Sequence, residues 1–414
     1  MTYFSYKNKQ LHAETTPLAD IADKFGTPCY IYSKAALVSS FNSFRDAFKK
    51  REHLICYAVK ANSNLAILNL FARMGSGFDI VSGGELTRVT AAQGDPRKVV
   101  FSGVGKRAEE MRAALEANIL CFNVESESEL LRLNEVAGKV GKKALFGLRI
   151  NPDVDPRTHP YIATGLKENK FGVDYADALA LYRKAKSLPH LEATGIDCHI
   201  GSQLTEVTPF IEALDRILVL LDKLEKSGIT ISHIDIGGGL GIRYHDEAPP
   251  NISEYAAAVL AKLGKRQQTI LIEPGRALVG HAGILLTRVE YLKHNRGKYF
   301  AIVDAAMNDL QRPALYGAYH DILPVCQVSR TCRTYEIAGP VCESADFIGR
   351  DRKLGLAEGD LLAIMSAGAY GMSMSSNYNS RPRAAEVMVD DDKAILIRTR
   401  ETLDQLFSGE TLLS

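Results

Sequence analysis

Paired cysteines are missing from this sequence. Its 414 residues include seven cysteines, but none of them forms a Cys-x-x-Cys pair. An odd number of scattered cysteines favours reduced thiols and a cytoplasmic location, and it indicates neither a disulfide framework nor a structural zinc site. We therefore expect a cytoplasmic protein without a bound metal.

Long apolar runs and an excess of one charge are missing as well. No run of about eighteen apolar residues occurs, and the start MTYFSYKNKQLH has no apolar core flanked by basic residues and a cleavage site. The sequence therefore predicts neither a membrane span nor a secretory signal. Lys plus Arg number 50 and Asp plus Glu 49, so the net charge of +1 favours neither nucleic acid nor a membrane surface. A small molecule is the expected partner.

The composition that remains is typical of a globular protein, with 46% apolar and 24% charged residues. A chain of 414 residues is too long for one ordinary core, so we expect two domains, one of them large enough to be an α/β barrel. Neither an internal repeat nor a long linker is evident.

Short apolar runs, each followed by a helix-like segment, recur along the chain as far as Gly275. The eight runs span residues 54–60, 78–82, 98–103, 120–126, 144–150, 193–201, 233–239 and 269–275. Eight such units with nearly continuous apolar strands are typical of a parallel (β/α)8 barrel that is buried on both faces. A doubly wound open sheet is the alternative, although it more often has about five to seven strands.

The pattern changes after Arg276. RVEYLKHNRGKYFAIVDAA, RTYEIAGPVC, GDLLAIMSAG and AAEVMVDDDKAILIRTRET predict antiparallel strands joined by turns, and the N-terminal TPCYIYS predicts a strand that pairs with them. The expected fold class is α/β: a (β/α)8 TIM-like barrel over residues 34–276, plus a C-terminal antiparallel β domain over residues 277–414 that residues 1–33 complete.

In a barrel, reactive groups lie at the carboxyl ends of the strands. The expected strands end in Lys60, Asp79, Ser102, Asn123, Arg149, His199, Gly237 to Gly239, and Glu273. A packed core alone does not require so many polar or ionisable side chains together with a glycine-rich loop. The strand ends therefore predict a binding or catalytic site.

The glycine triplet in DIGGGLG allows two interpretations. Glycine has no Cβ, so the backbone N–H groups can approach a phosphate closely. A tight turn from strand to helix would select the same residues, and both interpretations stay open. The spacing is neither GxGxxG nor a Walker loop, so a phosphate here would belong to a phosphorylated cofactor.

Lys60, at the end of CYAVKAN, also has two interpretations. It could extend its amine to solvent or pair with a nearby carboxylate. Beside a phosphate loop, His199 and Glu273, it could instead form a Schiff base with pyridoxal phosphate. Burial would then serve the chemistry, because desolvation lowers the pKa of an ammonium group and makes the amine nucleophilic.

Four motifs occur in an order that resembles a known family: YAVKAN, HIGS (199–202), GGGLG (237–241) and EPGR (273–276). On a barrel followed by a β domain, they resemble the alanine-racemase-like, fold type III pyridoxal phosphate decarboxylases. GLKENKFG (165–172), RPALYGAYH (312–320), GPVCES (339–344) and GAYG (368–371) resemble the branch that acts on diaminopimelate. The resemblance covers essentially the whole chain.

The resemblance implies how pyridoxal 5'-phosphate is held. Lys60 would form the Schiff base, Glu273 would face the pyridine nitrogen and keep it protonated, and His199 would stack on the ring. Ser202, Gly239 and the backbone at Gly275 and Arg276 would take the phosphate. The complete cofactor-binding set is Lys60, Asp79, His199, Ser202, Gly237, Gly238, Gly239, Glu273, Gly275, Arg276 and Tyr370.

The resemblance also implies the reaction, which is decarboxylation of meso-2,6-diaminopimelate to L-lysine and CO2, the last step of lysine biosynthesis. Lys60, His199 and Cys342 would be catalytic, with the Cys342 thiol reprotonating Cα. That thiol comes from the other subunit in the family, so a homodimer with shared active sites is expected. The substrate would contact Arg276, Arg312, Tyr316, Glu343 and Tyr370.

Two alternatives accompany this interpretation. The chain could decarboxylate ornithine, arginine or carboxynorspermidine, although RPALYGAYH and the pair of arginines count against these substrates. It could also be a non-catalytic cofactor-binding relative, although Lys60, Glu273 and Cys342 are all present. Ala345 departs from the family pattern, which has glycine after Cys-Glu-Ser, and it could alter the path of that loop.

Overall fold

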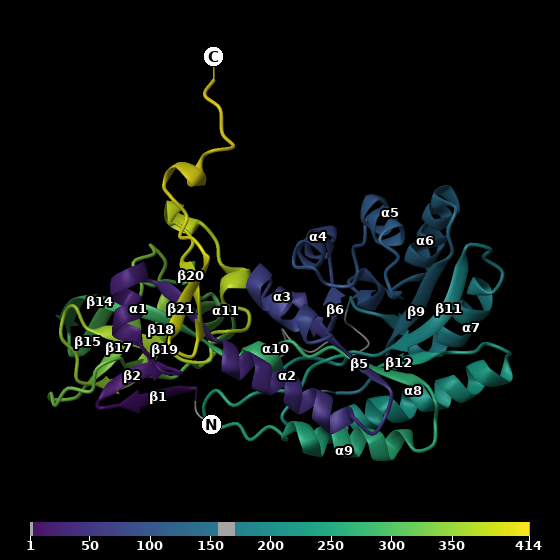
Figure 1. Ribbon diagram of the computed structural model, residues 1–414, viewed down its shortest axis with the longest axis horizontal. Coiled ribbons are helices and arrows are strands. Elements are labelled where there is room, and N and C mark those ends of the chain that lie inside the picture. The colour runs from purple at the N-terminus through teal and green to yellow at the C-terminus, as the bar shows by residue number, and fades with distance from the viewer. Residues whose placement is uncertain (1–2, 156–169, 414) are drawn as a thin grey trace. The chain divides into compact units, whose positions relative to one another are not determined.

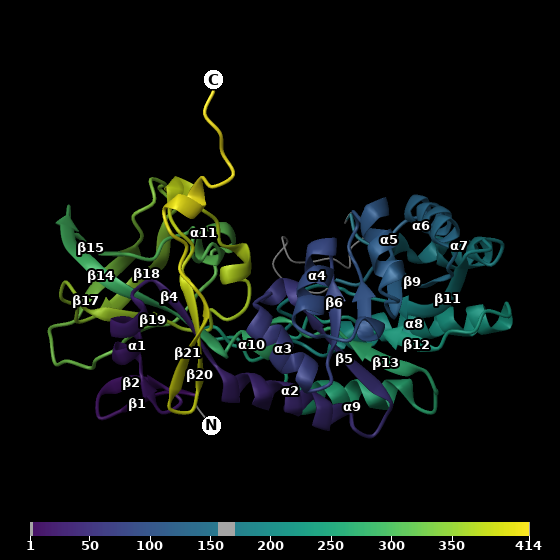
Figure 2. The same ribbon diagram turned by 45° about the horizontal axis from the view of Figure 1, so that its top comes forward.

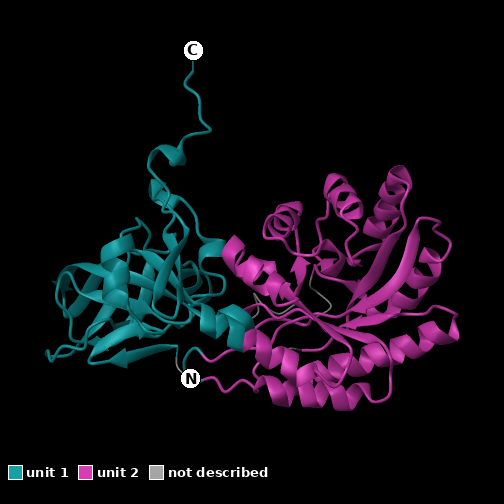
Figure 3. Ribbon diagram, in the orientation of Figure 1, with its two compact units in different colours: residues 1–39, 244–246, 278–414 teal, residues 40–243, 247–277 magenta. Residues whose placement is uncertain are grey.

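The computed structural model describes residues 3–155 and 170–413, so the part of GLKENKFG before Lys170 lies outside the described residues. The chain forms two compact units (Figure 3). Unit 1 comprises Met1–Ser39, Tyr244–Asp246 and Leu278–Ser414, and unit 2 comprises Ser40–Arg243 and Glu247–Ala277. Helix α2 (Lys34–Phe48) runs from unit 1 into unit 2.

Unit 2 contains the predicted barrel, which is confirmed. Its eight strands are β5 (His53–Ala58), β6 (Gly77–Ile80), β7 (Val99–Phe101), β8 (Cys121–Val124), β9 (Ala144–Asn151), β11 (Leu191–Asp197), β12 (His233–Asp235) and β13 (Thr269–Ile272). Each pairs in parallel with its neighbours, and the β8–β9 pair closes the ring. A short strand, β10 (Val173–Asp174), adds to β9. The strands are apolar runs because both of their faces are buried.

Helices surround the barrel strands on the outside (Figures 1 and 2). They are α3 (Leu65–Arg73), α4 (Gly83–Ala91), α5 (Ala108–Glu116), α6 (Glu127–Val140), α7 (Tyr175–Ala185), α8 (Thr208–Lys226) and α9 (Ile252–Leu263). Polar side chains fix several helix starts, because Asn64, Ser82, Ser126, Asp174 and Asn251 each accept a first-turn N–H group. In the described parts of the chain, no helix is both long and apolar enough to cross a membrane.

Unit 1 is built on a mixed sheet with the order β18-β17-β15-β14-β4-β20-β21, and β14 also pairs with β19, which pairs with β16. Its strands are β4 (Cys29–Ser33), β14 (Gly283–Asn295), β15 (Lys298–Val303), β16 (Ile322–Pro324), β17 (Arg333–Ala338), β18 (Phe347–Leu354), β19 (Leu361–Ile364), β20 (Ala385–Asp390) and β21 (Lys393–Arg398).

Two strand pairs differ from the expected antiparallel arrangement. β4 and β20 run parallel, and so do β15 and β17. The strands of the first pair come from opposite ends of the chain. Between the two strands of the second pair runs a long connection that includes α11 (Arg312–Tyr316) and β16. Parallel pairing requires such crossovers, whereas a hairpin turn allows only the antiparallel direction.

The N-terminal residues contribute more than the one strand that the sequence singled out. A three-stranded antiparallel sheet of β1 (Phe4–Lys7), β2 (Gln10–Ala13) and β3 (Thr16–Pro17) precedes α1 (Leu18–Phe25). These strands are short and only partly apolar, which is why their sequence pattern is weak.

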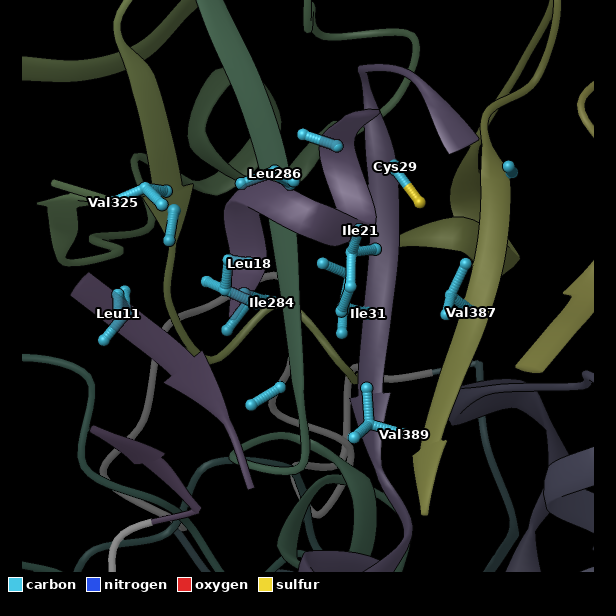
Figure 4. Close-up of a cluster of buried hydrophobic side chains, with 14 residues drawn as sticks. Leu11, Leu18, Ile21, Cys29, Ile31, Ile284, Leu286, Val325, Val387 and Val389 are labelled. Carbon is cyan, nitrogen blue, oxygen red and sulfur yellow. The ribbon is translucent and has the colours of Figure 1, made fainter. Parts of the chain in front are cut away.

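Figure 4 shows a cluster of buried apolar side chains in unit 1. Its labelled members are Leu11, Leu18, Ile21, Cys29, Ile31, Ile284, Leu286, Val325, Val387 and Val389. They come from both ends of the chain. All five residues of β4 are buried, and the Tyr32 hydroxyl donates to Glu386 Oε1 at 2.7 Å. The N-terminal strand is thus a central part of the core of unit 1.

Shortening Ile31 to alanine should therefore destabilise the protein. Ile31 is completely buried, so Ile31→Ala should cost about 2–5 kcal/mol through lost apolar burial and the cavity left behind. Ile395 is 46% exposed in the same sheet, so Ile395→Ala is a matched control with an expected cost below about 1 kcal/mol. Urea unfolding followed by circular dichroism measures both. Equal costs for the two variants would contradict the central place of β4.

Candidate active site

Lys60 lies directly after β5, in a 3-10 turn formed by Val59–Ala61. Its Nζ lies 2.5 Å from Asp79 Oδ2 at the carboxyl end of β6, and the two side chains are 36% and 0% exposed. The side chain of Lys60 is only partly buried, because the turn after the strand carries it to the mouth of the barrel. The ion pair with Asp79 holds the amine in place.

Three carboxyl groups gather beside this pair. Side-chain oxygens of Asp197, Asp235 and Glu273, which lie at the ends of β11, β12 and β13, are all within 4.8 Å of one another. Burial, and then repulsion from Asp235, Asp79 and Asp197, raises the pKa of Glu273 well above its usual value. Burial also raises the pKa of Asp235 to about 6. Burial and mutual repulsion therefore increase the proton affinity of this group of carboxyls.

Such a trio has the spacing of a metal site, but a cation already lies beside it. Arg149 Nε is 4.0 Å from Asp197 Oδ2, and Arg149 Nη1 is 3.0 Å from Glu125 Oε1. Raised pKa values and a buried guanidinium both weaken the attraction of these carboxyls for a metal ion. The carboxyl groups therefore suit proton-bearing roles better than metal ligation.

Glu273 has an atom suited to a ligand. Its Oε1 is buried and has no hydrogen-bond partner among the described residues. Buried polar atoms normally have partners, so an unpartnered one in a site indicates a group that binds there. A carboxyl oxygen at this position could bond to an N–H group on a ring nitrogen, as the pyridine of pyridoxal phosphate has when it is protonated.

His199 follows β11 and carries no charge at neutral pH. Burial, followed by the positive charges of Arg149 and Lys60, lowers the pKa of His199 well below its usual value. The backbone N–H of Gly238 donates to His199 Nδ1 at 3.1 Å. Because Nδ1 accepts this bond, the proton of the neutral ring is on Nε2. The bond fixes the plane of the imidazole.

The glycine triplet forms a tight turn after β12. A Cβ on Gly238 would lie 2.1 Å from the carbonyl oxygen of Glu273, and Gly239 has φ +108°, so side chains are excluded from this backbone. The N–H groups of Gly237 and Gly238 donate to Asp235 and His199. The tight-turn interpretation is thus confirmed, whereas the phosphate interpretation stays a prediction, because two of the three N–H groups already have acceptors within the protein.

Ser202 and Arg276 come together from different loops. Arg276 Nη2 donates to Ser202 Oγ at 3.0 Å, and Arg276 is 6% exposed at the start of α10 (Arg276–Val279). A hydroxyl and a guanidinium in contact are a suitable pair for an anionic oxygen. The structure therefore brings Lys60, Asp79, His199, Ser202, the glycine triplet, Glu273, Gly275 and Arg276 to one end of the barrel.

The other expected site residues lie in unit 1. Arg312 begins α11, and its guanidinium carbon is 4.4 Å from the centre of the Tyr244 ring. Arg312 Nη1 lies 2.8 Å from His320 Nε2, and His320 Nδ1 lies 2.8 Å from the carbonyl oxygen of Met365. Nδ1 must donate to that carbonyl, so Nε2 accepts from Arg312. These contacts hold Arg312 in one orientation, one helical turn from Tyr316.

Cys342 and Glu343 lie on the loop between β17 and β18, and both are exposed. Tyr370 has a left-handed backbone with φ 55° and is half-buried. Ala345 does not belong to the described non-glycine residues with positive φ. The backbone at Ala345 therefore does not require glycine, and alanine fits the loop without strain.

Sequence reasoning missed Glu85 and Glu125. Glu125 Oε1 and Oε2 accept the N–H groups of Gly103 and Gly172, and Oε1 also accepts from Arg149. Glu85 ends the sequence Ser-Gly-Gly-Glu, in which Ser82 Oγ caps α4 by accepting the N–H of Glu85, and Glu85 Oε2 accepts the N–H of Val81 at 2.7 Å. The capping pattern was a visible signal, but it did not reveal that Glu85 interacts with Lys60 and Asp79.

Glu85 gives the protein a specific dependence on pH. Burial is the main cause that raises its pKa from 4.5 to about 7. The folded state therefore binds more protons than the unfolded state between these values, so its stability falls as the pH rises through this window. Glu85→Gln, which keeps an acceptor for Val81, should raise the unfolding free energy by about 1–2 kcal/mol at pH 8, because partial exposure reduces the full effect.

Urea unfolding of the cofactor-free protein measures this effect. At about pH 4.5 the difference between the Gln variant and the parent should be a small fraction of that at pH 8, because Glu85 is then neutral in the folded state and only half ionised in the unfolded chain. Glu192 is exposed, so Glu192→Gln is the matched control and should show no such pH-dependent difference. If the stability difference between Glu85→Gln and the parent did not change with pH, the raised pKa of Glu85 would be refuted.

Comparisons with known proteins agree with this arrangement. The family model "Pyridoxal-dependent decarboxylase, pyridoxal binding domain" matches residues 34–280. A diaminopimelate decarboxylase of Vibrio cholerae is 59% identical over 415 residues, covering 100% of both chains. One of Pseudomonas aeruginosa is 57% identical over 413 residues, again covering 100% of both.

Solved structures are similar over nearly the whole chain. Diaminopimelate decarboxylase from Helicobacter pylori, complexed with L-lysine, has a TM-score of 0.92 at 44% identity and covers 95% of this chain and 99% of its own. The enzyme from M. jannaschii with L-lysine has a TM-score of 0.95 at 40% identity, covering 99% and 98%. The chain thus belongs to the pyridoxal-dependent decarboxylase family and, within it, to the diaminopimelate decarboxylases.

Proposed function

We propose that the protein decarboxylates meso-2,6-diaminopimelate to L-lysine and CO2. The observation that carries the proposal is the combination of Lys60, neutral His199 and buried Glu273 at one end of a barrel, in a chain 59% identical over its full length to a diaminopimelate decarboxylase. The lysine-bound relatives from Helicobacter pylori and M. jannaschii carry the product of this reaction.

The residues at the barrel mouth fit pyridoxal phosphate. When bound, this cofactor supplies a carbonyl carbon for amines and a ring that accepts the electrons released with CO2. Lys60 would bind the carbonyl carbon. When the substrate amine takes the place of Lys60, the released Lys60 amine would pair with Asp79. Ser202, Gly239 and the backbone at Gly275 and Arg276 would hold the phosphate, since the N–H groups of Gly237 and Gly238 donate within the protein.

Glu273 would hold a proton between its carboxyl group and the pyridine nitrogen. Burial raises the pKa of Glu273, which favours the form of the carboxyl that carries a proton. A proton shared at that nitrogen draws electrons away from Cα of the substrate, which favours loss of the carboxylate. His199, neutral and oriented by Gly238, would cover one face of the ring and keep water away from it.

The distal amino-acid head of diaminopimelate distinguishes it from ornithine and lysine. Arg312 and Arg276 would pair with the distal carboxylate, assisted by Tyr316 and Tyr370, and Glu343 would pair with the distal ammonium. The contacts of Arg312 with His320 and Tyr244 support this role, because a fixed guanidinium loses less freedom on binding. A lysine/ornithine decarboxylase of Vibrio vulnificus is 20% identical and shares the fold alone.

Cys342 would return a proton to Cα after CO2 leaves. The thiol and Glu343 would act in the site of a second subunit, which makes a homodimer part of the proposal. A two-fold interface would complete two sites at once. We further propose that the barrel domain spans residues 34–276, that residues 1–33 and 277–414 form the second domain, and that the enzyme works in the cytoplasm. The two compact units, which change over after Ser39 and after Ala277, and the family match at 34–280 support these boundaries to within a few residues.

Replacing Lys60 tests the proposed cofactor attachment. The parent protein mixed with pyridoxal phosphate should gain the near-visible absorbance of the attached cofactor and form lysine and CO2 from meso-diaminopimelate. Lys60→Ala should lose that absorbance and fall below about 1% of the parent activity, because the amine that attaches the cofactor is removed. Lys139 is an exposed lysine of the same unit, and Lys139→Ala is the control. Attachment that persists in Lys60→Ala would refute the assignment.

Replacing Arg312 tests substrate recognition. Arg312→Lys keeps the charge but loses the two-pronged donor set, so the KM for diaminopimelate should rise about 10-fold or more while the bound cofactor keeps its spectrum. Arg350, 56% exposed in unit 1, gives the matched control Arg350→Lys, which should leave KM unchanged. An unchanged KM in Arg312→Lys would remove this arginine from the proposed substrate contacts.

A further inference from the structure

The loop between β17 and β18 carries Cys342 and Glu343, which are both exposed, on a rigid base. Asp346 is 3% exposed, and its Oδ1 and Oδ2 accept the N–H groups of Met307 and Val341 at 2.7 and 2.8 Å. Within the loop, the N–H of Glu343 donates to the carbonyl of Val341 at 2.8 Å. Asp346 thus fixes the ends of the loop.

A second segment holds the tip of this loop. Asn379 Oδ1 accepts the backbone N–H of Cys342 at 2.9 Å. The Tyr378 hydroxyl donates to Glu343 Oε1. The adjacent residues Tyr378 and Asn379 therefore bond to the adjacent loop residues Glu343 and Cys342, respectively. Loop packing alone does not require this one-to-one match.

The backbone of the second segment is in an unfavourable conformation. Asn379 has φ 55° and ψ 28°, and Ser380 has φ 53°, so two consecutive non-glycine residues are left-handed. Such residues persist only where their surroundings enforce the conformation, and they concentrate at functional sites. Asparagine tolerates it better than most residues, because its side chain can bond locally.

The surroundings of this segment provide that enforcement. Asn377 Nδ2 donates to Glu401 Oε2 at 2.7 Å, and Arg383 Nη1 donates to Asn377 Oδ1 at 2.6 Å. Arg381 Nε donates to Asn308 Oδ1 at 3.0 Å. A network of charged and amide side chains therefore anchors both ends of the segment and directs Asn379 toward Cys342.

We propose that Asn379 and Tyr378 are positioning residues, with Asn379 orienting Cys342 through its backbone N–H and Tyr378 orienting the Glu343 carboxylate. The inference rests on the proposed function, in which Cys342 returns a proton to Cα and Glu343 pairs with the distal ammonium. A proton donor works only within hydrogen-bond reach of the atom that it protonates. Because the loop is exposed, a hydrogen-bond acceptor from another segment is needed to keep the Cys342 thiol within that reach.

Two substitutions at Asn379 separate the amide acceptor from the backbone conformation. Asn379→Gly keeps the left-handed backbone at no steric cost but loses the acceptor, whereas Asn379→Asp keeps an acceptor oxygen and tolerates the same conformation. Ser380→Gly relieves the neighbouring left-handed residue without touching Cys342, and it is the matched control. Full-length proteins loaded with pyridoxal phosphate are compared, together with the parent and Cys342→Ala.

The first measurement is the amide exchange rate of Cys342, resolved to the single residue by mass spectrometry. Asn379→Gly should speed this exchange about 10-fold or more, and Asn379→Asp should stay near the parent. The second measurement is lysine formed per CO2 released. This ratio should remain near one in the parent, Asn379→Asp and Ser380→Gly, and it should fall in Asn379→Gly. In Asn379→Gly, kcat should also fall roughly 10- to 100-fold while KM stays nearly unchanged.

Tyr378→Phe provides an independent test that does not depend on how Asn379→Gly folds. It should raise KM for diaminopimelate several-fold while lysine per CO2 stays near one. Parent-like exchange in Asn379→Gly, equal impairment of the Gly and Asp variants, or an unchanged KM in Tyr378→Phe would each overturn the assigned role. If the parent formed no lysine, the proposed function would fail, whereas the exchange rates would still test whether Asn379 holds Cys342.

Discussion

The barrel buries more negative than positive side chains at the carboxyl ends of its strands, and the site depends on how this charge is balanced. Asp79, Asp197, Asp235 and Glu273 are all 5% exposed or less. Isolated ionised carboxylates are very unfavourable in such surroundings, so each must be paired or protonated. Lys60 and Arg149 supply the pairing, and burial raises the pKa values of Asp235 and Glu273. Carboxyls of increased proton affinity therefore lie beside the amine of Lys60.

This balance requires rigid support. Glu125 bonds to Arg149 and to the N–H groups of Gly103 and Gly172, so one carboxylate joins three segments of the barrel rim. Lys106 and Glu129 form a second buried pair at 2.7 Å nearby, and Glu129 Oε2 accepts the N–H of Glu125. Buried ion pairs add little net stability, but breaking one leaves an uncompensated charge. The network therefore fixes geometry more than it adds stability.

Unit 1 depends on a different constraint, which is the position of β4. Because β4 lies between β14 and β20, the C-terminal strands cannot complete their sheet without residues from the N-terminus. Arg312 on α11 and the loops that carry Cys342 and Tyr370 belong to the connections between the strands of unit 1. Accurate placement of these residues thus requires that both ends of the chain fold together.

The sequence by itself determined the eight barrel strands and most residues at their ends, because buried parallel strands leave continuous apolar runs and the polar residue that ends each run is local information. Lys60, Asp79, His199 and Glu273 were identified in this way. Only the tertiary structure decided the parallel pairs β4–β20 and β15–β17, the partial exposure of Lys60, and the roles of Glu85 and Glu125 beside the site. Strand partners, burial and pKa values are set by groups far apart in the chain, and a local pattern does not contain them.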